Sequence, residues 1–444
     1  MINITDKHNC CGCEACVQAC PKQCISFNED TEGFRYPKVD MSLCVECGAC
    51  ERKCPVMSPF ESRLPKLQVA AINSDEAIRA QSSSGGIFTM LAEKVIREGG
   101  VVFGVRFDEH WQAVFDHTDS IEGLASFRGS KYIQARVGNV FTEVRTYLRN
   151  GRKVMFTGTS CQVAALRHFL HHDYDNLLLV DVVCHGVPSP KVWRRYLDEV
   201  TKNAVRAISD IQFRNNKQGW KRFNFDLTCD SEGHNLNISS YHQKNHFMRI
   251  FLNDVILRPS CHQCKAKGGR SGSDLTIADF WGIGQLNPDM DDDLGTSLVL
   301  VYTDKGAAHL LALHVNVWQA QYEDVLHFNS AIEQSKHEHP KREWFFDHLD
   351  TTDSVISLIN STLRPPFFTR IKNASKKLIG KVCRALINGG GNFGREEQII
   401  VAYQESDPIF MQPTGVRCPI IKAITFRSKQ SGWNRYRMKI RIEK

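Results

Sequence analysis

The chain has 444 residues, 42% of them hydrophobic and 24% charged, a composition typical of a globular protein with about two or three domains. No stretch approaches the ~20 consecutive apolar residues of a membrane-spanning helix, and the N-terminus lacks the basic and apolar segments of a signal peptide, so we expect a cytoplasmic protein. Residues 361–444 carry a net charge of +12, which leaves −5 for the rest of a chain whose total is +7, and an acidic body excludes the basic face of a nucleic-acid-binding domain.

Residues 1–58 are rich in cysteine and short of long apolar runs, so bound metal must supply much of their stability. Their cysteines form two copies of C-x-x-C-x-x-C-x-x-x-C-P, the run of bacterial two-cluster ferredoxins, in which the fourth cysteine ligates the other 4Fe-4S cluster. This spacing predicts a ferredoxin-like domain with two cysteine sets. The first set is Cys10, Cys13, Cys16 and Cys54, and the second set is Cys20, Cys44, Cys47 and Cys50.

Structural zinc is the alternative for these cysteines. Zinc usually takes cysteines in pairs rather than in triplets, so two complete copies, each followed by proline, favour iron–sulfur clusters. Cys11 and Cys24 fall outside the spacing, and we interpret them as small buried residues.

Residues 59–68 contain two prolines and are interpreted as a linker. After it, apolar periodicity predicts alternating strands and helices, and from about residue 208 the pattern becomes strand-rich. We therefore expect a mixed α/β (α+β) domain over 69–355 with a mainly parallel sheet. The predicted strands are 101–107, 153–157, 176–183, 275–280 and 297–303, and the predicted helices lie between Gly86 and Gly99 and over 140–148, 162–170 and 191–200.

Two single cysteines follow neighbouring predicted strands: Cys161 comes after 153–157 and Cys184 after 176–183. If those strands are parallel neighbours, both thiols emerge at the carboxyl edge of the sheet, where such folds bind ligands. The pair Cys261-x-x-Cys264 would complete a third set of four thiolates, which suits zinc as well as a cluster. Other cysteines, Cys229, Cys383 and Cys418, are interpreted as small buried residues.

Six segments in order, SSSGGIFTMLA, RGSKYIQA, FTGTSCQVAAL, CHGVPSP, RPSCHQC and DFWG, resemble the family of coenzyme F-420 hydrogenase/dehydrogenase beta subunits. The resemblance runs from residue 1 to about 350. It implies a flavin-dependent iron–sulfur oxidoreductase with FAD and a third 4Fe-4S cluster on Cys161, Cys184, Cys261 and Cys264. The chain departs from the family with Ser160 in place of Pro and Ala278 in place of Gly; the Ser160 hydroxyl could donate a hydrogen bond to a cluster or flavin.

Two segments are candidates for holding FAD. Ser84, Gly85 and Gly86 precede a helix whose free N–H groups could receive a pyrophosphate, although an ordinary helix cap is the alternative. The segment Gly129, Ser130, Lys131 and Tyr132 offers a cation, a turn and an aromatic face, with a solvated loop as its alternative. No Rossmann G-x-G-x-x-G precedes a suitable helix.

His185, beside Cys184, is the candidate proton donor to substrate or flavin, with a hydrogen bond to the cluster or a structural role as alternatives. The expected function is an enzyme that passes electrons between a two-electron small-molecule substrate and a one-electron redox partner, either a ferredoxin-like protein or a complex subunit. Family members act on the deazaflavin coenzyme F-420, and many bacterial relatives lie in surface-polysaccharide gene neighbourhoods, so a related metabolite is the other candidate substrate.

Two different classes of function remain open. One is an electron-transfer subunit of a larger redox complex with no substrate of its own, and the other is an assembly or regulatory protein that uses clusters as sensors. Residues 356–444 form a basic tail in which 369–387 could be an amphipathic helix. That tail is interpreted as solvated, with weak attachment to the inner face of the membrane as the alternative.

Overall fold

The computed structural model describes residues 1–201, 208–229, 236–365, 424–427 and 437–440, and its chain divides into two compact units. The first unit is Met1–Arg364 and the second is Pro365–Lys444. In the second unit the structure describes one antiparallel pair, β14 (Ile424–Arg427) with β15 (Arg437–Ile440). The amphipathic helix predicted over 369–387, like Cys383 and Cys418, lies outside the described residues.

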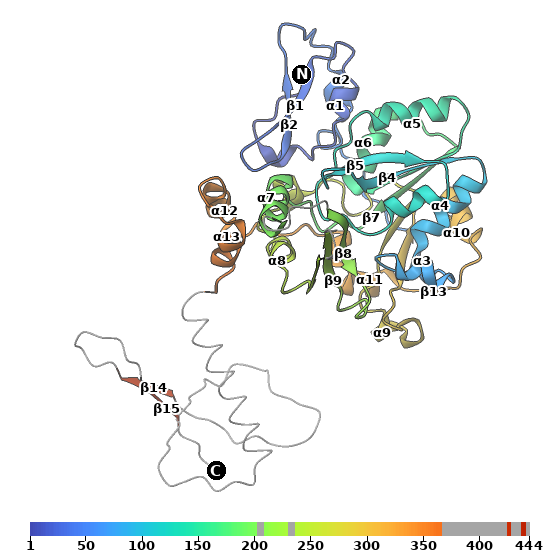
Figure 1. Ribbon diagram of the computed structural model, residues 1–444. Helices are drawn as coiled ribbons and strands as arrows, with labels where there is room; N and C mark the ends of the chain where they lie inside the picture. The colour runs from blue at the N-terminus through green and yellow to red at the C-terminus, as the bar shows by residue number, and fades with distance from the viewer. Residues whose placement is uncertain (202–207, 230–235, 366–423, 428–436, 441–444) are drawn as a thin grey trace. The chain divides into compact units, whose positions relative to one another are not determined.

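The N-terminal part of the first unit is a small body of short elements (blue in Figure 1). The hairpin of β1 (Ile25–Glu29) and β2 (Arg35–Val39) packs with two single-turn helices, α1 (Ala15–Gln18) and α2 (Ala49–Arg52). Each helix begins after a residue in the left-handed conformation, which allows a tight loop of cysteines to lead directly into a helical turn. Its buried core consists mostly of cysteines: Ile2, Cys16, Cys24, Ile25, Cys50 and Cys54.

An eight-stranded mixed sheet forms the centre of the larger part, in the order β13-β3-β12-β11-β7-β6-β4-β5. The central pairs β4–β6, β6–β7 and β7–β11 are parallel, whereas the pairs toward both edges are antiparallel. The predicted mixed α/β class is therefore confirmed, with the parallel part at its centre. The strands are β3 (Leu67–Ala71), β4 (Val101–Phe107), β5 (Ala113–Thr118), β6 (Val154–Thr159), β7 (Leu177–Val182), β11 (Leu275–Asp279), β12 (Ser297–Val301) and β13 (Val317–Gln319).

Strand β3 begins at Leu67, within the last two residues of the segment interpreted as a linker. Its backbone pairs with β12 over Leu67–Ala71, and its last three residues are buried. Pairing with β12 therefore makes these residues a strand, although the nearby proline is typical of a linker. Strand β5 was not predicted from the sequence, and it returns antiparallel to β4 after a short turn.

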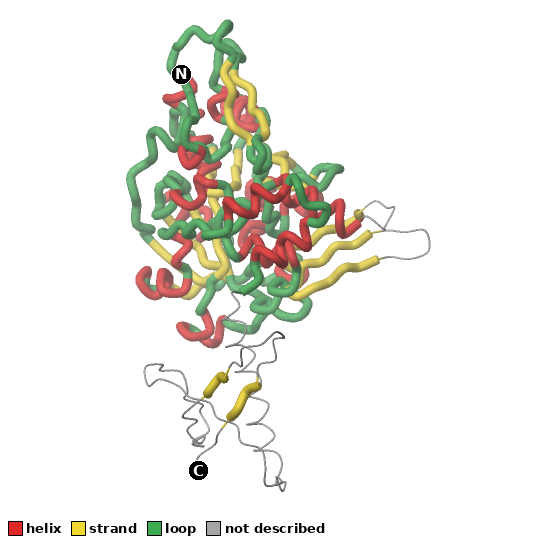
Figure 2. The backbone as a smooth tube through the Cα atoms, turned by 90° about the vertical axis from the view of Figure 1, so that its left-hand side faces the viewer, coloured by secondary structure: helices red, strands yellow, loops and turns green. Residues whose placement is uncertain are grey.

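Helices cover both faces of this sheet, and each predicted helix of the alternating region is present. A separate antiparallel sheet consists of β8 (Ile208–Asn215), β9 (Asn224–Cys229) and β10 (Leu236–Tyr241), whose strands lie side by side on the right of Figure 2. No helix among the described residues is long and apolar enough to cross a membrane. The longer helices are α4 (Ile87–Arg97), α5 (Val140–Arg149), α6 (Ser160–Leu170), α7 (Pro190–Thr201), α8 (His246–Leu252), α10 (Asp304–Leu311), α11 (Tyr322–Phe328), α12 (Arg342–Leu349) and α13 (Val355–Thr362).

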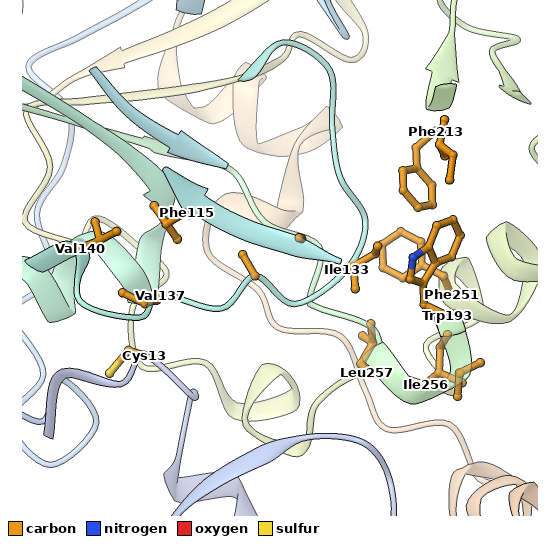
Figure 3. Packing of buried hydrophobic residues seen from close by; sticks show 14 of the residues in the cluster. Cys13, Phe115, Ile133, Val137, Val140, Trp193, Phe213, Phe251, Ile256 and Leu257 are labelled. Atoms are coloured by element: carbon orange, nitrogen blue, oxygen red, sulfur yellow. The ribbon is translucent and has the colours of Figure 1, made fainter. Parts of the chain in front are cut away.

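One hydrophobic core joins the N-terminal body to the larger part. Figure 3 shows Cys13 beside Val137 and Val140, and both Cys13 and Ala15 belong to the core cluster that also contains the aromatic side chains of α7, β8 and α8. In that cluster Trp193 packs against Phe213 with ring centroids 5.0 Å apart. The cysteine-rich body is therefore held against the sheet domain by side-chain packing.

Candidate iron–sulfur and flavin sites

The first cysteine set gathers residues from both copies of the motif. Burial raises the pKa of the Cys16 thiol, and the neighbouring thiols of Cys10 and Cys54 raise it further. Burial likewise raises the pKa of Cys54, with an added contribution from Cys10. Cys54, the fourth cysteine of the second copy, therefore lies near Cys10 and Cys16 of the first copy. Cys50 of the second set also acts on Cys16 and Cys54, so the crosswise assignment of ligands stays a prediction.

The second cysteine set lines one pocket, in which Cys20 stands with the three leading cysteines of the other copy. Cys47 is exposed there, whereas Cys50 is buried. Cys24, which the sequence analysis interpreted as a small buried residue, also lines this pocket, and its Sγ lies 3.4 Å from Cys20 Sγ. The contact with Cys20 raises the pKa of Cys24 to about 11.

The third cysteine set converges on one pocket at the carboxyl edge of the parallel strands. Cys161 lies in the first turn of α6, directly after β6, and Cys184 follows β7, the parallel neighbour of β6. Cys261 and Cys264 come from the single-turn segment Pro259–Gln263 and the residue after it, and all four cysteines line the same pocket. Burial raises the pKa of Cys184 to about 12, so four thiolates can coexist here only with a compensating positive charge.

Four thiols can hold either a single zinc ion or a 4Fe-4S cluster. No group of three or more His, Cys, Asp or Glu side chains within the described ranges is arranged to hold one metal ion. The iron atoms of a cubane occupy separate corners, so its cysteines stand farther apart than the four ligands of a zinc ion. The donor chemistry of all three sets, four thiols each, fits a 4Fe-4S cluster.

Sequence reasoning missed two residues at the third set. Cys11 lines the same pocket, and a hydrogen bond with the Cys11 thiol is the largest influence raising the pKa of Cys161. Lys267 is only 6% exposed, and its Nζ donates to the carbonyl oxygen of Cys184 at 2.6 Å. The sequence placed Lys267 three residues after Cys264, but only the fold directs its ammonium toward the thiols.

The two segments predicted to hold FAD, Ser84–Gly86 and Gly129–Tyr132, lie close together in the structure. The amide nitrogen and hydroxyl of Ser130 lie 2.8 and 3.0 Å from the Ser83 hydroxyl, so the Gly129–Tyr132 segment lies beside the residues that precede α4. Gly86 has a φ of 81° and Gly129 a φ of 76°, and a side chain at Gly129 would meet open space. Helix α4 begins at Ile87, as predicted, with backbone N–H groups of its first turn available.

Lys131 supplies a partly buried cation in the segment that contacts Ser83. Its Nζ donates to the carbonyl oxygens of Ser126 and Arg128 at 2.8 and 2.7 Å, and burial lowers its pKa to about 7. An anion beside the ammonium would favour its charged form, so the donors present fit a phosphate group.

Two side chains predicted to contact a cofactor, Tyr132 and Ser160, have protein partners in the structure. The Tyr132 ring packs against Phe213 and Phe251, with centroids 5.6 and 5.0 Å apart, so its face is already used in the core. Ser160 lines the pocket of the third set, but its hydroxyl also hydrogen-bonds Asp181, a carboxyl whose pKa is raised chiefly by burial.

His185 lies in the pocket of the third set with a carboxylate partner. Its Nε2 is 2.6 Å from Asp254 Oδ1, and its ring meets Phe251 edge-on at 5.0 Å. Asp254 lies 69 residues away in the sequence, so no local signal pointed to it. The pair fixes the orientation of the imidazole.

Comparison with known families agrees with this arrangement. Residues 68–141 match the family model for the N-terminal part of the coenzyme F420 hydrogenase/dehydrogenase beta subunit, and residues 151–319 match the model for its C-terminal part, together more than half of the chain. The chain belongs to this family. Residues 9–58 match the 4Fe-4S dicluster domain, so the oxidoreductase-type body carries an iron–sulfur, ferredoxin-like domain at its N-terminal side.

Curated relatives are distant. A protein of Methanosarcina mazei that is named as one of the subunits of F(420)H(2) dehydrogenase is 24% identical over 226 residues, which cover 47% of this chain and 62% of the relative. An uncharacterized protein of Methanocaldococcus jannaschii is 25% identical over 39% of this chain and 56% of its own length. A 7Fe ferredoxin of Hydrogenibacillus schlegelii is 43% identical over 46 residues, 10% of this chain and 53% of the ferredoxin. The chain thus spans less than two thirds of the length of each of these relatives.

Among solved structures, a chain of the F420-reducing [NiFe] hydrogenase complex from Methanosarcina barkeri is similar with a TM-score of 0.39 and 15% identity. The similarity covers 68% of this chain and 91% of that chain. At this level it carries no argument about function.

Proposed function

We propose that this chain is an iron–sulfur flavoprotein oxidoreductase that passes electrons between an organic two-electron substrate and a one-electron carrier. The convergence of four cysteines at the carboxyl edge of the sheet carries the proposal, because that edge adjoins the two-cluster domain. Cys11, next to a cysteine of the first set, reaches the pocket of the third set. Such a layout suits electron transfer between the two parts of the molecule.

Twelve cysteines would hold three 4Fe-4S clusters: the first, second and third sets defined above. FAD would lie against the Ser84–Gly86 and Gly129–Lys131 segments. Bound flavin and clusters would supply the conversion between two-electron and one-electron chemistry. Lys131 and the N–H groups that begin α4 would orient the phosphates, and Lys267 would offset the negative charge of the third set.

His185 would handle the proton that accompanies a hydride equivalent. When the imidazole is neutral, Nε2 donates its hydrogen to the Asp254 carboxylate, so Nδ1 is the nitrogen that can take up a proton. The carboxylate then stabilises the imidazolium that results. The printed name of the Methanosarcina mazei relative supports the deazaflavin coenzyme as the substrate, and a surface-polysaccharide metabolite remains the other candidate.

Metal and flavin content of the protein purified without oxygen tests the proposal. We expect about twelve irons and one FAD per chain, with little zinc. About eight irons, with zinc and without flavin, would contradict it and leave only the two-cluster domain. Lys131→Met should lose FAD while keeping its iron, and Lys66→Met, which changes a lysine paired with Asp304 at the surface, should keep both.

An electron-transfer subunit without its own substrate is the second candidate, favoured by the relative that is named as a subunit of a dehydrogenase. Turnover distinguishes the two. If the isolated protein reduces an artificial dye with the reduced deazaflavin coenzyme, it contains its own substrate site. If it exchanges electrons only with a partner protein, the subunit hypothesis holds.

A further inference from the structure

A fully buried arginine lies where the N-terminal body meets the third cysteine set. Arg258 is 0% exposed, and its Nε donates to the carbonyl oxygen of Cys10 at 2.7 Å. Its two terminal nitrogens donate to Gln134 Oε1 and to the carbonyl oxygen of Arg35, each at 3.0 Å. One of them also lies 3.5 Å from Cys10 Sγ, so the guanidinium contacts a thiol of the first set directly.

The positive charge of Arg258 is not balanced by a salt bridge among the described residues. In the part of the chain that the structure describes, Arg258 makes no ion pair with a carboxylate, and the rings of Tyr36 and Phe34 face it at 4.3 and 5.5 Å. A buried carboxylate, Glu14, feels the charge of Arg258 but forms its salt bridge with Arg35. A buried cation without a directly paired anion is costly, so a further anion is expected nearby. Burial disfavours the charged guanidinium, but Cys10, Tyr36 and the neighbouring thiols together outweigh this and raise its pKa.

Arg258 lies between two cysteine sets. Its guanidinium contacts Cys10 of the first set, and its backbone carbonyl accepts from the amide of Cys261 of the third set at 2.9 Å. The charge of the guanidinium also reaches the third set, where it acts to lower the otherwise raised pKa of the Cys161 thiol. Gly12 lies directly against the guanidinium. Its φ is +72°, and a Cβ there would stand 2.9 Å from an Arg258 nitrogen. The cysteine loop is therefore pressed against the guanidinium, as only glycine permits.

The second set stands apart from this junction. Its pocket shares no lining residue with the pocket of the third set, and Cys47 there is exposed. One buried cation thus adjoins two of the three cysteine sets.

We propose that Arg258 is a positioning residue that raises the reduction potentials of the clusters held by the first and third sets and leaves that of the second unchanged. This inference rests on the proposed function, since it requires clusters at both sets. A reduced cluster carries one more negative charge than an oxidised one, and a buried guanidinium stabilises the added charge strongly because little water screens it.

Redox titration followed by electron paramagnetic resonance on the full chain, purified without oxygen, tests this. In Arg258→Gln we expect two of three midpoint potentials to become more negative, with the reduced-to-oxidised ratio at a fixed potential falling at least tenfold, which is 59 mV for a one-electron couple. Arg258→Lys keeps the charge and should shift the same two potentials less. The third potential should stay unchanged in both.

Arg342→Gln is the matched control. Arg342 is also buried and also joins the N-terminal body to the larger part, through Glu32 at 2.8 Å and the carbonyl of Leu257 at 3.3 Å, but it contacts no cysteine in the described structure. Its loss should weaken the same junction without shifting any potential. Equal shifts in Arg342→Gln, or unchanged potentials in Arg258→Gln with all clusters present, would overturn the inference.

Failure of the proposed function has a different signature. If the unaltered protein holds fewer than about twelve irons, the third cluster is absent and the proposal of three clusters falls first. If only the Arg258→Gln variant loses iron, pulsed resonance on unaltered protein labelled with nitrogen-15 arginine decides. An arginine nitrogen coupled to the cluster of the first set, and lost in Arg258→Lys, supports the inference; no coupling overturns it.

Discussion

The cysteines of the N-terminal body and those of the third set are brought together by different parts of the chain. In the former, the eight cysteines of the first and second sets are among the ten cysteines of residues 10–54, and cysteines themselves make up most of the small core. In the latter, the cysteines come from three segments between 161 and 264, and the strands that carry them belong to a sheet with a large apolar core. We therefore expect bound clusters to stabilise the N-terminal body, whereas the sheet domain positions the cysteines of the third set without them.

Removal of iron should show the largest difference in stability between the N-terminal body and the sheet domain. Treatment with an oxidant and a chelator should unfold residues 1–58, because their apolar core is too small to persist alone, while the sheet keeps its structure. Hydrogen exchange measures both at once: amides of 1–58 should lose protection and those of β7 and β12 should keep it. Continued protection of 1–58 in the iron-free protein would break the comparison.

A cavity in the sheet core should produce the next largest effect. Phe156 in β6 is fully buried, with the rings of Phe115 and Phe141 at 5.2 and 6.0 Å. Phe156→Ala should lower the free energy of unfolding by about 3–5 kcal/mol. Denaturant titration measures this, and Leu311→Ala, at a side chain 73% exposed, should change it by less than about 0.5 kcal/mol. Similar losses in both variants would show that burial does not stabilise the sheet domain.

Loss of one cysteine from the third set should remove metal without unfolding the sheet. Cys264→Ser should lose about four irons per chain and lower the free energy of unfolding less than Phe156→Ala does, because the core does not depend on this site. Cys11→Ser, at the fifth thiol of the pocket, should keep all iron. The reverse pattern of iron contents would make Cys11 the ligand in place of Cys264.

The smallest effect belongs to a charged contact on the sheet domain. Hydrogen bonds from Lys153, at 2.8 Å, and from Lys94 lower the pKa of Glu98 to about 2. A lowered acid pKa stabilises the fold above pH 4.5, and this contribution is lost as the pH falls toward 2. Glu98→Gln should therefore cost less than about 1 kcal/mol at pH 7, and the difference from the unaltered protein in thermal unfolding should shrink below pH 5. A difference that grows with acidity would contradict this assignment.

Local signals explain what could be predicted. The spacing of the first two cysteine sets encodes their grouping because each loop of three cysteines folds within a few residues. Helices α4 to α7 and strands β4, β6 and β7 follow from apolar periodicity and from Gly and Pro at their ends, whereas β5 was not predicted. Even the convergence of Cys161 with Cys184 follows from the rule that parallel strands end at one edge.

Residues whose importance depends on distant partners escaped prediction. Asp254 acts through His185, and Arg258 through Cys10, which is 248 positions away. Tyr132 was predicted to offer its aromatic face to a cofactor, and only the fold shows that the ring packs against Phe213 and Phe251. Such contacts depend on which surfaces meet, and periodicity within one segment contains no information about that.

The sequence by itself determined the two-cluster domain, the mixed α/β class and the family, because thiol spacing and apolar periodicity are properties of short segments. Tertiary structure alone decided that the cysteine body packs against the sheet edge, with Cys11 in the pocket of the third set and a buried guanidinium between the two. The physical reason is that a buried charge selects partners by distance in space, and several elements far apart in the chain must fold together before that distance exists.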